Sequence, residues 1–176
     1  MPVRRGNGVR CSRQRARRCA VILFLDFDGV LHPENPTSRQ ALLSQLPPLE
    51  GVLREFPIVE VVISSTWRLK WADHSVATIE LRKHFSPDIA RQVVGVTPHH
   101  LHLDSKLAPD GLYLYHRHWE IETWLRTHRP PGTSWVALDD RAYTFRPFLK
   151  NLMEIDPTTG LTFEDLQELR RRFKQA

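Results

Sequence analysis

Residues 20–29, AVILFLDFDG, decide the fold of the chain. The first six are a continuous apolar run, mostly of residues that favour β-structure, and Asp26 and Asp28 follow at once. An apolar run of this length without polar alternation is typical of a strand buried on both faces, as in the centre of a parallel sheet. We therefore expect a central strand over residues 20–25 with carboxylates at its carboxyl end.

Strand and helix patterns alternate along the rest of the chain. We expect further strands over residues 58–63, 92–97, 134–138 and 152–155. We expect helices around residues 38–45, over 48–56, 75–84 and 119–128, and from 162 onward, with a loop over 99–116. This alternation predicts an α/β fold, a doubly wound parallel sheet with helices on both faces.

Two of these helices begin with capping signals. Ser75 is the expected cap of the helix over 75–84. The last helix begins with Thr162-Phe-Glu-Asp165, which is a capping-box pattern. It repeats apolar residues on one face, which we expect to pack on the core: Phe163, Leu166, Leu169 and Phe173.

The composition suits one domain with a core of its own, because the chain has 176 residues, 41% of them apolar. No apolar run approaches the roughly 18 residues that a membrane span requires. Residues 1–18 hold seven of the 25 basic residues and no acidic one, which leaves 18 basic against 20 acidic residues in the rest. We therefore predict a disordered basic tail over 1–18 and one domain over 19–176 with a slightly negative body.

The basic tail has two interpretations. It is either an uninvolved arm, which we favour, or an electrostatic arm that binds RNA or another polyanion. Cys11 and Cys19 are the two cysteines of the chain, and they form no Cys-x-x-Cys pair. Neither a disulfide framework nor a thiolate zinc site is indicated, so a cytoplasmic location is the expectation.

Acidic residues follow two of the expected strands. Asp26 and Asp28 come after the first, and Asp139 and Asp140 come after the strand over 134–138. In doubly wound sheets the ligand site lies outside the carboxyl ends of the strands, so these side chains should converge. Converging carboxylates repel one another unless a cation neutralises them, which implies a hard divalent ion with oxygen ligands.

Three segments resemble the motifs of the haloacid dehalogenase (HAD) superfamily. Asp26-Phe-Asp-Gly-Val-Leu31 is similar to its first motif, Ser64-Ser-Thr-Trp-Arg68 to its second and Leu138-Asp-Asp140 to its fourth. The resemblance covers about residues 20–156, and within the superfamily the chain looks like small domains related to the HAD modules of Swiss-army-knife RNA repair proteins. It implies a HAD-like Rossmannoid sheet. The segment over residues 32–47 is short, which implies a minimal cap and an exposed site.

The resemblance implies roles for the carboxylates. Asp26 would attack phosphorus and form an aspartyl-phosphate. Asp28 would protonate the leaving oxygen and later activate water, and an acid at this position is typical of the phosphatases of the superfamily. Mg²⁺ would be held by Asp26, Asp28, Asp139 and Asp140.

The second and third motifs imply the remaining site residues. Ser65 fits best as the hydroxyl that binds the phosphoryl group, with Ser64 as the alternative; one serine could instead cap the next helix. Arg68 would either clamp the substrate phosphate or lie on the surface. The lysine that the superfamily usually presents before the fourth strand is missing, and Arg117 takes its place in our assignment, with Lys106 as the alternative.

The sequence therefore supports two functions. The first is a Mg²⁺-dependent phosphohydrolase acting on a phosphomonoester, either a small molecule or a nucleic-acid end, with no membrane partner. The second is a HAD-like binding or regulatory module with little turnover, associated with nucleic acid through its tail.

The histidines do not add a metal site to this prediction. His99, His100 and His102 lie in the expected loop, and their spacing matches no standard zinc pattern. We expect a solvated loop there. His32, directly after the first motif, is left as an unranked candidate for substrate contact.

Overall fold

The apolar run after residue 19 forms the central strand of a parallel sheet in the computed structural model, which describes residues 20–36, 38, 41–104, 106 and 109–176. The basic tail predicted for residues 1–18 lies outside these described residues. The strands are β1 (Ile22–Leu25), β2 (Glu60–Ile63), β3 (Val93–Val96), β4 (Trp135–Asp139) and β5 (Leu152–Glu154). Their order is β3-β2-β1-β4-β5 and all neighbours are parallel, which confirms the predicted α/β fold.

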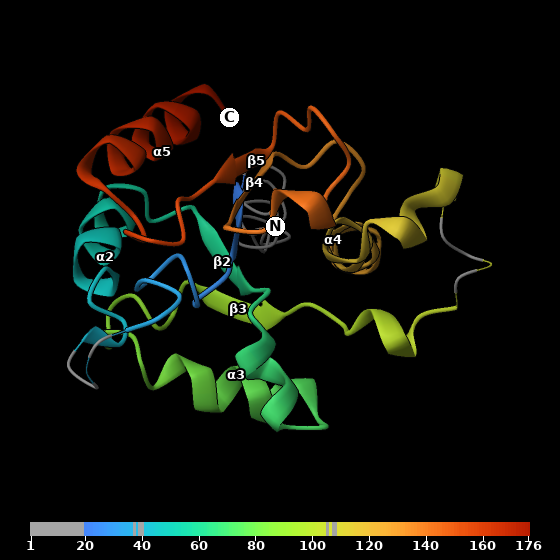
Figure 1. Cartoon of the computed structure of the whole chain (residues 1–176), viewed down its shortest axis with the longest axis horizontal. Helices are drawn as coiled ribbons and strands as arrows, with labels where there is room; N and C mark the ends of the chain where they lie inside the picture. Colours follow the sequence, from blue (N-terminus) through green and yellow to red (C-terminus); the bar gives the residue numbers. More distant parts are fainter. Residues whose placement is uncertain (1–19, 37, 39–40, 105, 107–108) are drawn as a thin grey trace, which may run out of the picture.

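Helices cover both faces of this sheet. They are α2 (Leu46–Glu55), α3 (His74–Arg82), α4 (His116–His128) and α5 (Phe163–Gln175). Leu23 and Leu25 of β1 face a core shared with α2, α3 and α5, whereas Ile22 and Phe24 face the other way, toward α4. The helices accordingly lie on opposite sides of the strands (Figure 1). No helix among the described residues is long and apolar enough to cross a membrane.

The capping box predicted for the last helix is present. The Thr162 hydroxyl accepts from the Asp165 N–H at 3.2 Å, and the Asp165 carboxylate accepts from the Thr162 N–H at 2.9 Å. Leu166, Leu169 and Phe173 are buried as expected, but Phe163 is 68% exposed, so its assignment to the core face was wrong. As the first residue of α5, Phe163 lies where the chain has only begun to turn onto the core.

Three other boundaries differ from the sequence prediction. Asp73, not Ser75, caps α3, because its carboxylate accepts from the N–H groups of residues 75 and 76 at 2.7 and 3.0 Å. The expected loop over 99–116 contains the short 3₁₀ helices η3 (His100–His102) and η5 (Pro109–Leu114), and α4 begins at its end. The helix expected around 38–45 lies partly outside the described residues, and its described end is a turn with Leu43 at a φ of 57°.

Candidate active site

Backbone pairing continues past the strand ends and sets the position of the site. The Asp26 N–H donates to the Leu138 carbonyl at 3.1 Å, and the Ser64 N–H donates to the Leu25 carbonyl at 2.9 Å. Asp139 is the last residue of β4. The residues that follow three neighbouring strands therefore meet at one edge of the sheet, as the sequence predicted.

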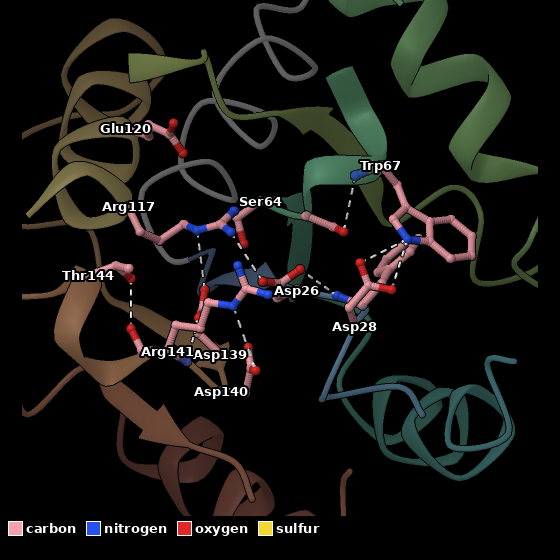
Figure 2. A network of polar contacts seen from close by, with 12 residues as sticks. Asp26, Asp28, Ser64, Trp67, Arg117, Glu120, Asp139, Asp140, Arg141 and Thr144 are labelled. Atoms are coloured by element: carbon pink, nitrogen blue, oxygen red, sulfur yellow. Dashed lines mark hydrogen bonds and ion pairs between the residues drawn. The ribbon is translucent and has the colours of Figure 1, made fainter. Parts of the chain in front are cut away.

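Asp26, Asp139 and Asp140 form an acidic cluster at this edge (Figure 2). One carboxylate oxygen of each lies within 4.8 Å of the others. Asp26 and Asp139 are 4% and 1% exposed. Burial, and then the charge of Asp26, raises the pKa of Asp140; burial, with Asp26 adding to it, raises the pKa of Asp139 to about 7. Ionising these buried carboxylates therefore costs free energy, and a bound cation would offset that cost.

Two oxygens of the cluster could take such a cation. Among the described residues, Asp139 Oδ2 and Asp140 Oδ1 are buried without a hydrogen-bond partner, although Asp139 Oδ2 lies within ion-pair distance of Arg117 Nε. Asp139 Oδ1, in contrast, accepts from the Arg141 N–H at 3.0 Å. Carboxylate oxygens that accept no hydrogen bond are ligands that suit Mg²⁺, so the residues present fit this ion.

Gly29 leaves room for the cluster. Its φ is +71°, and a Cβ built on it would lie 2.6 Å from Asp140 Oδ2. Both the backbone conformation and the close approach of a carboxylate exclude a side chain at this position. The glycine of the first motif is thus required for Asp140 to take its place in the cluster.

Arg117 of α4 is the buried cation of the site. Its Nη2 lies 3.2 Å from Asp26 Oδ2, and its Nε lies 3.3 Å from Asp139 Oδ2. Burial opposes its charge, but Asp26 and then Asp139 outweigh this effect and raise the pKa of Arg117. Its Nη1 has no hydrogen-bond partner among the described residues. Lys106, the alternative, is exposed, and its backbone N–H donates to the Asp104 carboxylate at 2.9 Å.

Asp28 lies apart from the acidic cluster, although the sequence placed its carboxylate among the metal ligands. The Trp67 Nε1–H is 3.0 Å from both of its oxygens, and His32 Nε2 is 3.2 Å from one of them. His32 Nδ1 accepts from the Leu43 N–H at 3.4 Å, so Nε2 carries the proton that faces Asp28. These donors turn the carboxylate away from Asp26, and its side chain is 35% exposed.

The two serines after β2 have different environments. The Ser65 hydroxyl caps η2 (Thr66–Lys70) by accepting from the Trp67 N–H at 3.3 Å, the capping role that the sequence left open. The Ser64 hydroxyl has no hydrogen-bond partner within the described part of the chain, and Figure 2 shows it beside Arg117 and Asp26. The geometry favours Ser64, the alternative, as the hydroxyl that faces the site.

Arg68 holds the loop after β2 and is not free for substrate. It is 3% exposed, which excludes the surface position considered for it. Its guanidinium donates to the Glu120 carboxylate at 2.7 Å and to four backbone carbonyls, those of Ser64, Ser65, Thr97 and Pro98. An arginine has five N–H donors, and all five have acceptors here.

Arg141 also lies at this site, although its side chain was not among the predicted site residues. It follows the acidic pair of β4, its side chain is 40% exposed, and its Nε lies 3.9 Å from Asp140 Oδ2. Burial opposes its charge, but Asp140 and the more distant Asp26 help to raise the pKa of Arg141. The sequence did contain a signal for this residue: it directly follows Asp140, so it must lie at the same edge of the sheet.

The chain matches the family described as "HAD domain in Swiss Army Knife RNA repair proteins" over residues 22–166, from β1 into α5. No curated protein and no solved structure gives a match. The matched region contains the acidic cluster, Asp28, the two serines and Arg117. The family match covers most of the chain and agrees with the parallel sheet and its motif-bearing edge. The chain therefore belongs to the HAD domain family of Swiss Army Knife RNA repair proteins.

Proposed function

We propose that the protein is a Mg²⁺-dependent phosphomonoesterase that acts through an aspartyl-phosphate on Asp26. The observation that carries this proposal is the separation of two carboxylates from one motif. Asp26 lies in the acidic cluster beside Arg117, whereas Asp28 is held outside it by Trp67 and His32. One carboxylate is thus placed for attack and the other for proton transfer.

The residues of the site account for the ordinary steps of such a reaction. A carboxylate oxygen of Asp26 forms a bond to phosphorus while the ester P–O bond breaks, and Asp28 gives a proton to the leaving oxygen. Water then attacks the phosphorus, Asp28 takes its proton, and inorganic phosphate leaves with the Asp26 carboxylate restored. Asp26, Asp139 and Asp140 would hold Mg²⁺, which supplies charge neutralisation between nucleophile and phosphate. Arg117 and the Ser64 hydroxyl are placed to bind the phosphoryl oxygens.

We further propose that the substrate is a phosphorylated nucleic-acid end. The family description names RNA repair proteins. The partly exposed Arg141 stands next to the acidic cluster and fits a phosphate contact, the role that the sequence gave to Arg68. The segment over residues 32–45, between the first motif and α2, is short, which suits a large substrate.

One observation favours the second function, a binding module with little turnover. Arg117 already pairs with Asp26, and an arginine bonded to the nucleophile lowers its readiness to attack. Such a module would bind a phosphorylated end without releasing phosphate.

The decisive experiment measures phosphate release with Mg²⁺ from RNA and DNA oligonucleotides phosphorylated at the 5′ or 3′ end, and from small phosphomonoesters. We expect release that EDTA abolishes and that Asp26→Asn removes. Asp88→Asn, a surface carboxylate paired with Arg54, is the matched control and should retain the rate. Acid quenching with a labelled substrate should leave label on the protein but not on the Asp26 variant. End binding without release would instead establish the module.

A further inference from the structure

A second group of potential ligands lies on the other side of Arg117. His99 directly precedes η3 and His100 is its first residue, and His116 and Glu120 come from the first turns of α4. We call these four residues the histidine cluster. The ring centroids of His99 and His100 are 4.4 Å apart, and those of His100 and His116 are 4.6 Å apart. Two imidazoles therefore group with the Glu120 carboxylate, and the third, His116, lies against the His100 ring, although His100 and His116 are 16 positions apart in sequence.

Glu120 is the fixed element of the histidine cluster. It is 1% exposed, and its two oxygens have different partners. Oε2 accepts from Arg68 at 2.7 Å, whereas Oε1 accepts from the His100 backbone N–H at 2.9 Å and lies 3.0 Å from His100 Nδ1. One oxygen is thus neutralised by a buried arginine, and the other faces the imidazoles.

The distances suit a small cation. His99, His100 and Glu120 each offer one ligand atom within 4.8 Å of the others. Zinc–ligand bonds of about 2.0–2.1 Å in tetrahedral geometry place ligand atoms about 3.3 Å apart, close to the 3.0 Å between His100 Nδ1 and Glu120 Oε1. Burial lowers the pKa of His99 and of His116, and it outweighs the opposing charge of Glu120; the lowered pKa favours the neutral imidazoles that bind metals.

We propose that the histidine cluster binds a borderline transition-metal ion of the Zn²⁺ class through His99, His100 and Glu120, with His116 as the fourth ligand. Nitrogen ligands favour Zn²⁺ over Mg²⁺, so the two sites would hold different ions. His102 lies beside His99, with ring centroids 5.8 Å apart, but it is exposed and is left out of the ligand set.

A metal here would act on the neighbouring site through Glu120. This carboxylate holds Arg68, and Arg68 holds the carbonyls of Ser64 and Ser65. The same helix carries Arg117, one turn before Glu120. A bound ion would therefore fix η3 to α4 and stabilise the loop after β2. We assign it this structural role and no step in phosphate transfer.

The experiment titrates metal-free full-length protein with Co²⁺ in excess Mg²⁺ and records the visible absorption of the cobalt ion. We expect one Co²⁺ per chain with the spectrum of nitrogen and oxygen ligands, displaced by Zn²⁺, and a higher melting temperature with Zn²⁺. The double variant His99→Ala, His100→Ala should lose this absorption, and His116→Ala should bind about tenfold or more weakly. His74→Ala, an exposed histidine at the start of α3, is the matched control.

Further variants separate this site from others. Asp139→Asn should keep the cobalt absorption, because it alters only the acidic cluster; loss of absorption in this variant would overturn the proposal. A thiolate charge-transfer band that disappears with Cys11→Ser and Cys19→Ser would place the metal on cysteines and would also overturn it. The same holds if the His99 and His100 double variant, folded by its melting temperature, keeps full absorption. None of these readouts depends on phosphatase activity.

Discussion

The Trp67 indole N–H lies 3.0 Å from both carboxylate oxygens of Asp28, which joins η2 to the loop after β1. The Trp67 ring also packs edge-on against Phe27, with centroids 5.4 Å apart. The ring is therefore fixed by packing, and its N–H fixes the carboxylate. This makes Trp67 a positioning residue for the proposed acid and base.

Trp67→Phe should slow turnover without unfolding the protein. The phenyl ring can still pack on Phe27, but Asp28 loses its indole donor and is no longer oriented. We expect the rate on an alkyl phosphate to fall about 10- to 100-fold, and the rate on an aryl phosphate with a good leaving group to fall less, because it needs less protonation. Trp71→Phe, on the core and without a bond to Asp28, is the control. Equal losses on both substrates would contradict the positioning role.

Substitution of the two serines should separate phosphate binding from capping. Ser64→Ala removes the hydroxyl beside Arg117, so we expect a large loss in kcat/KM with little change in melting temperature. Ser65→Ala removes the cap of η2 and should cost about 1 kcal/mol of stability. Phosphate release and thermal unfolding of both variants test this. If Ser65→Ala gave the larger kinetic loss at an unchanged melting temperature, the assignment would revert to Ser65.

The role of the positive charge of Arg117 can be tested by variants that remove or keep that charge. Arg117→Met leaves Asp26 and Asp139 buried without their cation, which should destabilise the metal-free protein by about 3–5 kcal/mol. Arg117→Lys keeps the charge and should retain part of the activity, because a lysine is usual at this place in the superfamily. Arg126→Met, exposed on the same helix, should change little. Denaturant unfolding with and without Mg²⁺ measures the effect; a stability unchanged by Arg117→Met would contradict the ion pairs.

The stability of the metal-free protein should depend on pH through Asp139. Burial and Asp26 raise the pKa of Asp139 to about 7, above the roughly 3.9 of an unfolded aspartate. The folded state then binds more protons between these values, so stability falls as the pH rises from about 4 to about 7. Mg²⁺ favours the ionised form, so it should raise the melting temperature more at about pH 8 than at about pH 5. Asp139→Asn should flatten this dependence; a Mg²⁺ effect equal at both pH values would argue against the cluster as the metal site.

Two glycines form a matched pair. Gly29→Ala places a methyl group 2.6 Å from Asp140 in a backbone conformation with φ +71°, so we expect it to displace that carboxylate and weaken the response to Mg²⁺. Gly51→Ala meets no atom within 4 Å and lies inside α2, where it should stabilise by about 0.5–1 kcal/mol. Mg²⁺ titrations followed by melting temperature compare them. A normal Mg²⁺ response in Gly29→Ala would show that Asp140 can move without loss.

The sequence predicted the parts of the site that depend on strand ends. Asp26, the serines after β2 and Asp139 meet because parallel strands in register bring their carboxyl ends to one edge, and that register follows from apolar runs. The choice of Ser65 over Ser64 within that pair was not supported by the geometry. Arg117 could also be predicted as the cation of the site, because it lies at the start of α4, the helix that precedes β4.

Hydrogen bonds between side chains that are far apart in the sequence could not be predicted from it. The bond from Trp67 to Asp28 spans 39 positions and depends on the rotamers of both side chains. Many acceptors in the chain could pair with the Arg68 guanidinium. Which of them it contacts, Glu120 and the nearby carbonyls, depends on how the folded segments pack. The histidine cluster needed α4 to begin at His116, earlier than its apolar pattern indicated.

Helix α4 is the sole α-helix packed on its face of the described sheet, so the site depends on the docking of this one helix during folding. Arg117 faces the acidic cluster from this helix, and Glu120 fixes Arg68 from the next turn. A chain with every strand paired but α4 not yet docked would have its carboxylates in place without their counter-cation, and a loose serine loop. Under the proposed function, activity toward phosphate esters would then require α4 to be docked, and a chain in which this helix had not yet packed on the sheet would be inert.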